Sequence, residues 1–186
     1  MTSGHHAIND LLAALLNSQI EPDNSPIIDN MRLYEAFTTG PGLNNEEQRI
    51  LCLSPTSRAR YLQIKRKINA EIRSRWRAQG LALSLIAKAA AAQNTLLDFQ
   101  AADGSFSVTL YRQDDADMPW MILLRLSPRV RDTLHSTTMI RLVDSGGLEW
   151  VRGRPDARGE ISFGWYDLQN PAEQRLREYA LTLDLV

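Results

Sequence analysis

The sequence has few residues that could hold a metal or a cofactor. Its 186 residues include one cysteine, Cys52, and three histidines, His5, His6 and His135. A single cysteine can form neither an intramolecular disulfide nor a thiolate zinc cluster, and it fits a reducing compartment. The two adjacent histidines have no acidic partner at ligand spacing, so we interpret them as part of a flexible chain terminus. The sequence therefore predicts no metal and no cofactor.

Catalytic motifs are also missing. No Gly-x-Ser-x-Gly elbow accompanies His135, and no glycine-rich phosphate loop is present. Cys52 lies between two leucines, which favours a buried, inert thiol. The acidic loop of Asp114, Asp115 and Asp117 lacks the ligand series of a calcium loop. We therefore expect a protein that is not an enzyme.

Long apolar runs are absent too. No run reaches about 18 residues, the length that a membrane-spanning helix needs. Residues Met1 to Gly4 lack the basic and apolar regions of a signal peptide. The content of hydrophobic residues, 44%, is ordinary for a globular protein. These features predict a cytoplasmic protein with no membrane contact.

The most informative stretch that is present runs from Ser57 to Leu97, which we predict as a helix of about forty residues. Between Arg58 and Arg77 it carries eight basic residues and one acid, Glu71. Outside Arg58 to Arg77 the chain has 13 basic and 21 acidic residues, although the net charge of the whole chain is only −1. Gly80 interrupts the pattern, and the helix could bend, break or turn there. The alanine-rich second half would need a covering partner.

The basic half of this helix has two kinds of face. Apolar residues recur at steps of three or four, which predicts a buried stripe: Tyr61, Ile64, Ile68, Ile72 and Trp76. The basic residues outside this stripe would form either a solvated surface or an interaction face for an acidic partner. The candidate partner-binding residues are Arg58, Arg60, Arg66, Lys67, Arg73 and Arg77.

Three shorter helices are expected before the basic one. They cover residues 7–20, Ile27 to Phe37 and Glu46 to Leu53, with Asn44 or Asn45 as the cap of the third. After Asp98 the apolar period changes from helical to alternating, and turn residues recur at short spacing. The strands expected there lie at 99–101, 105–110, 120–126, 139–143, 148–151, 161–166 and 179–186, with a short helical turn at 171–178. We therefore predict an α+β fold, with a helical region at 1–97 and an antiparallel β-sandwich at 98–186.

Part of the β region resembles known domains. Ile140 to Val143, the Gly146-Gly147 turn, Trp150-Val151 and the Asp156 to Gly159 turn before Ile161 to Phe163 are similar to carboxypeptidase-regulatory-like and transthyretin-like β-sandwiches. The likeness covers about 30 residues. It implies a domain that is usually a non-catalytic adaptor.

The helical region resembles cytoplasmic anti-sigma-factor regions. The likeness rests on Leu11 to Leu16 and on the Glu46 to Tyr61 segment that precedes the long helix. Zinc-type members of that group carry a His and a Cys-x-x-Cys, and this chain departs from that pattern because it has only Cys52. The resemblance is therefore compatible only with the zinc-free members.

Together these features predict a bacterial-type regulatory or adaptor protein whose helical half binds a protein partner with an acidic surface, such as a sigma factor or a defence-system enzyme. An alternative is DNA binding through a helix-turn-helix-like segment at 46–77, with Thr56, Ser57, Arg58 and Arg60 at the start of the recognition helix. A third hypothesis makes the chain a protease substrate that is cleaved near Gly80.

Overall fold

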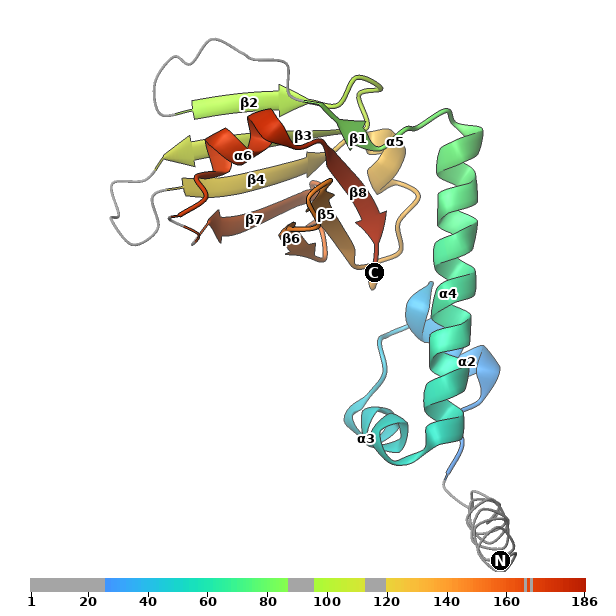
Figure 1. The fold of residues 1–186 in the computed structure, drawn as a ribbon. Helices are drawn as coiled ribbons and strands as arrows, with labels where there is room; N and C mark the ends of the chain where they lie inside the picture. The colour runs from blue at the N-terminus through green and yellow to red at the C-terminus, as the bar shows by residue number, and fades with distance from the viewer. Residues whose placement is uncertain (1–25, 87–95, 113–119, 166, 168) are drawn as a thin grey trace, which may run out of the picture.

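The computed structural model describes residues 26–86, 96–112, 120–165, 167 and 169–186. Within these ranges the chain forms helices and two antiparallel sheets, so the expected α+β class is confirmed. The helix expected at 7–20 and the acidic loop at 114–117 lie outside the described residues. In Figure 1, α4 leads from α2 and α3 at its one end to the two sheets at the other.

Helices α2 (Asn30–Phe37) and α3 (Asn45–Leu53) pack against α4 (Pro55–Ala78). Each begins at a side-chain cap. The Asp29 carboxylate accepts from the backbone N–H of Met31, 2.7 Å away, and Asn44 forms a capping box with Glu47. Such caps satisfy N–H groups that have no partner within the helix. The expected helices at 27–37 and 46–53 are therefore confirmed, the first beginning three residues later than predicted.

The long helix ends at Ala78, so the prediction of a helix that continues to Leu97 is wrong. Gly80 has a φ of +69°, the left-handed conformation that only glycine adopts at little cost. Its N–H donates to the Arg77 carbonyl and the Leu81 N–H donates to the Trp76 carbonyl, at 2.9 and 3.0 Å. This pattern closes the end of a helix. Gly80 is therefore a helix stop, and the alanine run at 87–92 lies outside the described residues.

The first sheet has the strand order β1-β8-β5-β6 and the second has the order β2-β3-β4-β7. The strands of the first are β1 (Ser84–Leu85), β8 (Leu181–Leu185), β5 (Ile140–Asp144) and β6 (Glu149–Gly153). Those of the second are β2 (Leu96–Gln100), β3 (Phe106–Arg112), β4 (Trp120–Leu126) and β7 (Glu160–Trp165). Two strands, β1 and β2, thus begin before the boundary expected after Leu97. Two short helices complete the fold, α5 (Pro128–Arg131), which the sequence did not predict, and α6 (Ala172–Glu178).

Alternate residues of β3, β4, β5 and β8 are buried in one core. In β3 these are Phe106, Val108 and Leu110, all at most 2% exposed, as the alternating pattern predicted. Trp150 of β6 and Trp165 of β7 bring the two sheets together, with ring centroids 4.7 Å apart. The same core includes Ile68, Ile72 and Trp76 of α4. The long basic helix α4 therefore packs its buried residues into the same core as the two sheets.

Candidate protein-binding groove

The buried stripe of α4 has the composition that its sequence pattern predicted. Ile68, Ile72 and Trp76 are at most 3% exposed, while Tyr61 and Ile64, nearer the start of the helix, are half-buried. The indole N–H of Trp76 donates to the hydroxyl of Thr133, 2.7 Å away. The C-terminal half of α4 is therefore fixed against the sheets, and the N-terminal half is more open.

Arg73 is part of this attachment. Its guanidinium donates to the Asp184 carboxylate at 2.7 Å and to the Leu185 carbonyl at 2.9 Å. Arg141 also donates to Asp184. Burial by itself raises the pKa of Asp184, but the hydrogen bonds from Arg73, the Leu185 N–H and Arg141 outweigh it and hold that pKa below its usual value. Arg73 therefore binds the chain's own C-terminal strand.

Arg58 also has an internal role. Its Nε and Nη2 atoms donate to the carbonyls of Leu51 and Cys52, at 3.2 and 2.6 Å. These two carbonyls lie at the C-terminal end of α3, where no further helical turn supplies a donor. Arg58 therefore caps α3. Of the six basic residues predicted to bind a partner, four have side chains with no hydrogen bond or ion pair to a described residue: Arg60, Arg66, Lys67 and Arg77.

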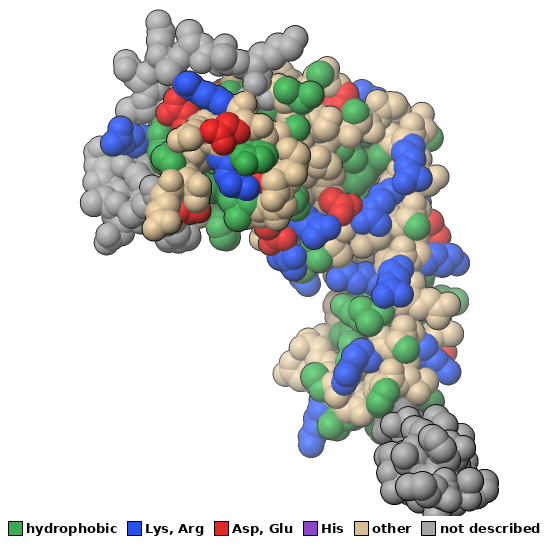
Figure 2. Space-filling model, in the orientation of Figure 1, with side chains coloured by type: hydrophobic (Ala, Val, Ile, Leu, Met, Phe, Trp, Pro, Cys, Tyr) green, Lys and Arg blue, Asp and Glu red, His purple; other side chains and the backbone are tan. Residues whose placement is uncertain are grey.

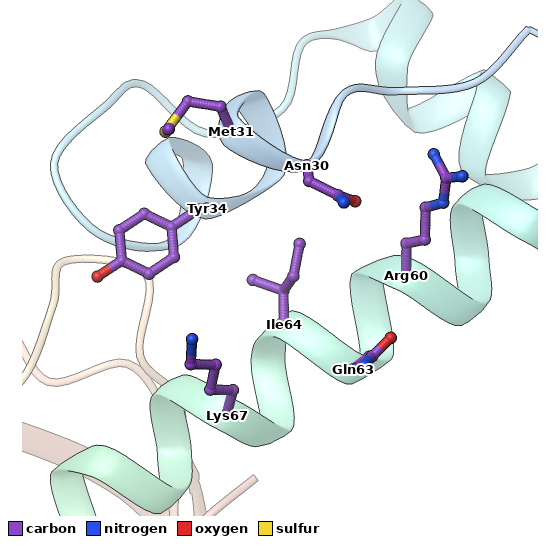
Figure 3. A pocket seen from close by; sticks show the side chains of 7 residues that line it. All are labelled: Asn30, Met31, Tyr34, Arg60, Gln63, Ile64 and Lys67. Carbon is purple, nitrogen blue, oxygen red and sulfur yellow. The ribbon is translucent and has the colours of Figure 1, made fainter.

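Two of these four, Arg60 and Lys67, line a groove between α2 and α4 with a volume of about 470 Å³. Figure 3 shows Ile64 pointing from α4 toward α2, with Arg60 and Lys67 on either side of it along the helix. Met31 and Tyr34 of α2 belong to the same groove and are 65% and 40% exposed. Neither Arg60 nor Lys67 forms an ion pair with any described residue. The groove thus combines exposed apolar surface with two unneutralised positive charges.

Arg66 and Arg77 lie exposed on a different side of α4 and likewise lack an ion pair within the described part of the chain. The space-filling view in Figure 2 shows Lys and Arg side chains following α4 and continuing onto the adjoining edge of the sheets. The positive surface is therefore wider than the groove.

The sequence did not assign Met31 and Tyr34 to a site. Both are apolar positions within the helix predicted at 27–37, as are Leu33 and Phe37. In the structure Leu33 and Ala36 form the buried side of α2, and Met31 and Tyr34 lie on its exposed side. The sequence did contain a signal for this exposed apolar surface. A short helix with apolar side chains on two faces can bury only one of those faces against a single neighbouring helix.

The start of α4 does not present its side chains as a recognition helix would. Ser57 is fully buried, and its hydroxyl accepts from the backbone N–H of Ile28 at 3.2 Å. Ser54, which caps the helix, is buried as well. With Arg58 used as a cap, three polar residues at this end have roles inside the fold. This arrangement weakens the helix-turn-helix hypothesis.

Cys52 and His135 are the remaining candidate residues that the structure describes. Cys52 is exposed, so the expected burial of its thiol is wrong. The pKa of His135 is lowered by burial and by the positive charge of Arg75. Among the described residues no cluster of His, Cys, Asp and Glu could hold a metal, and no helix is long and apolar enough to cross a membrane.

Comparison of the chain with protein-family models, curated proteins and solved structures gave no match. The resemblances to anti-sigma-factor regions and to carboxypeptidase-regulatory-like or transthyretin-like domains stay predictions.

Proposed function

We propose that this protein is a non-catalytic regulatory or adaptor protein whose helical part binds a protein partner with an acidic surface. The observation that carries the proposal is the groove between α2 and α4, where Met31, Tyr34 and Ile64 stand beside the unpaired charges of Arg60 and Lys67. Exposed apolar side chains rimmed by charge are typical of surfaces that bind other proteins. In this proposal the two sheets form a β-sandwich that supplies a second contact surface.

The partner would present an acidic, amphipathic segment. Apolar side chains of that segment would cover Met31 and Tyr34, and its carboxylates would approach Arg60 and Lys67, as in helix-in-groove recognition. A sigma-type regulator or a defence-system enzyme of a bacterial cell would be a partner of this kind.

The test is a pulldown from the native cell with the full-length tagged protein, after nuclease treatment, with the captured proteins identified by mass spectrometry. The Arg60→Glu/Lys67→Glu variant reverses both charges of the groove. Because each pairing with a partner carboxylate then becomes a repulsion, we expect the yield of the partner to fall by about tenfold or more.

The matched control reverses the charge of Arg112 and Arg158. Both are exposed and lie in the sheet part, by which we mean the chain from Leu81 onward. This variant should retain the partner, and both variants should keep the circular dichroism spectrum and melting temperature of the wild type. Equal capture by the wild type and by the groove variant would exclude the groove as the binding site.

DNA binding remains the alternative, favoured by the exposed row of basic side chains along α4 in Figure 2. Counterion release would then make the affinity for duplex DNA fall steeply with salt. A salt-independent affinity, or a protein partner that survives nuclease treatment, would exclude it. The protease hypothesis gains no support, because the backbone N–H groups of Gln79, Gly80 and Leu81 are all bonded in the helix end.

A further inference from the structure

A second cavity lies where the helices meet the sheet part. Its volume is about 420 Å³, which is within the range of sites that bind small molecules. Three helices contribute to it, and so do the segment before β5 and the residue after β6. Its lining residues are Ala36, Phe37, Gly42, Leu43, Gln48, Leu51, Tyr61, Lys65, Thr137, Met139 and Arg154. No residue of this set lines the groove between α2 and α4.

The charges of this cavity have one sign. Lys65 and Arg154 line it, and none of its lining residues is an aspartate or a glutamate. Neither cation forms a salt bridge with any residue that the structure describes. Other arginines of the fold do have an acidic partner, for example Arg32 with Glu47 and Arg175 with Asp144. The lining of the cavity therefore carries two basic side chains and no acidic one.

The remaining walls are mainly apolar. The rings of Phe37 and Tyr61 lie 4.7 Å apart between centroids, and Leu43, Leu51 and Met139 complete this surface. The hydroxyl of Thr137 donates to the Phe37 carbonyl at 2.7 Å, which joins the loop before β5 to the end of α2. A ligand with an apolar body could therefore bury it here while an anionic group faces the two cations.

We propose that this cavity binds a small organic anion, with a carboxylate or phosphate group on an apolar body. The planar guanidinium of Arg154 suits the paired oxygens of either group, and the ammonium of Lys65 adds a second charge. Bound there, the ligand touches helices and sheet-part segments at once. Because only the folded chain forms this cavity, the ligand at free concentration c raises the free energy of unfolding by RT ln(1 + c/Kd). This site does not depend on the proposed partner binding, since the two share no residue.

The experiment uses the full-length protein and five defined probes in isothermal titration calorimetry. Octanoate and octyl phosphate carry both features, 1-octanol lacks the charge, and acetate and inorganic phosphate lack the apolar body. Octanoate or octyl phosphate should bind with a Kd of about 1 mM or below, and each of the other three should bind about tenfold more weakly. The tighter of the two amphipathic anions identifies the head group as carboxylate or phosphate.

Amide chemical shifts place the bound probe. The largest changes should include Gly42, Leu43 and Thr137, which line the cavity. Changes centred on Met31 and Tyr34 instead would assign the probe to the groove and overturn the proposal. Equal affinity for octanoate and 1-octanol would also overturn it, because the cations would then contribute nothing.

Two variants test the charges and the volume of the cavity separately. Lys65→Gln/Arg154→Gln removes both charges and should weaken binding of the anion about tenfold, with the affinity for 1-octanol unchanged. Leu51→Trp keeps both charges but fills part of the cavity, and it should weaken both probes. The control Arg112→Gln/Arg158→Gln removes the same charge from exposed positions and should bind like the wild type. If the control loses as much affinity as the cavity variant, only the net charge of the protein matters and the proposal is wrong.

Discussion

The helical part and the sheet part bury their side chains very differently. From Leu81 onward, apolar residues of both sheets and of α6 form one large core. Among the described residues before it, Ile28, Leu33 and Ala36 are the only buried hydrophobic side chains that lie outside that core, and α3 buries no residue completely. The helical part is held instead by caps, ion pairs and its attachment through α4.

This difference explains where exposed apolar surface remains. Two short helices against one long helix cannot enclose all their apolar side chains, so Met31, Tyr34, Leu53 and Leu62 stay between 40% and 65% exposed. Apolar residues of both sheets belong to one core, in which most of them are buried. The helical part is therefore the better candidate for binding a macromolecule.

The largest effect should come from the core of the sheet part. Asp144 is buried, accepts from the Trp150 indole and the Leu148 N–H, and pairs with Arg175, whose guanidinium lies over the Tyr179 ring. Asp144→Asn leaves the Arg175 charge without its counterion, so the free energy of unfolding should fall by about 3 kcal/mol. Denaturant unfolding followed by tryptophan fluorescence measures this change.

The control for that variant is Glu160→Gln, which removes an ion pair to Arg125, a side chain that is 56% exposed. Its cost should be below about 1 kcal/mol. If the two variants lose similar free energies of unfolding, the buried Asp144 ion pair stabilises the sheet part no more than an exposed ion pair does.

An intermediate effect is expected where the two parts join. Arg73→Gln loses the ion pair to Asp184, whose side chain is 33% exposed, so solvent screening limits the cost to about 1 kcal/mol. Hydrogen exchange should become faster at the backbone amides around Ile72 and Leu183.

Arg66→Gln is the comparison for this junction, because Arg66 is exposed on the same helix without an ion pair among the described residues. Its effect on stability should be within about 0.5 kcal/mol. If Arg73→Gln and Arg66→Gln change the rates of amide hydrogen exchange equally, Arg73 does not attach α4 to the sheets. This contrast also makes Arg66 a better choice than Arg73 for testing partner binding by charge reversal.

The smallest effect should be confined to the helical part. Asn44→Ala removes the capping box of α3, which costs about 1 kcal/mol of helix stability locally. Because α3 contributes no buried side chain to the core, the amides of Glu47 and Gln48, which donate to Asn44, should lose protection while those of the sheets do not.

Asn45→Ala, one residue later and already inside the helix, should leave α3 protected. Loss of protection in the sheets on Asn44→Ala would mean that the two parts unfold together rather than separately.

Local sequence signals predicted most of the elements. The alternation of Phe106, Val108 and Leu110 gave the buried face of β3, and Asp144 to Gly147 gave the β5–β6 hairpin, because both patterns depend on near neighbours in the chain. The helix predicted after Gly80 is wrong for the residues that the structure describes there, 81–86 and 96–97. Leucine has high helix propensity, but pairing of Ser84 with Thr182 and of Leu97 with Leu110 makes these residues strands.

The sequence by itself determined that α4 is basic on one side and apolar on another, since helical periodicity follows directly from residue order. Only the tertiary structure decided what each basic side chain does. Arg73 meets Asp184, 111 residues away, and Arg58 meets the last carbonyls of α3, whereas Arg60 and Lys67 border a groove and Lys65 shares a cavity with Arg154. Charge is a property of the residue, but whether that charge is already paired depends on which distant segments folding brings beside it.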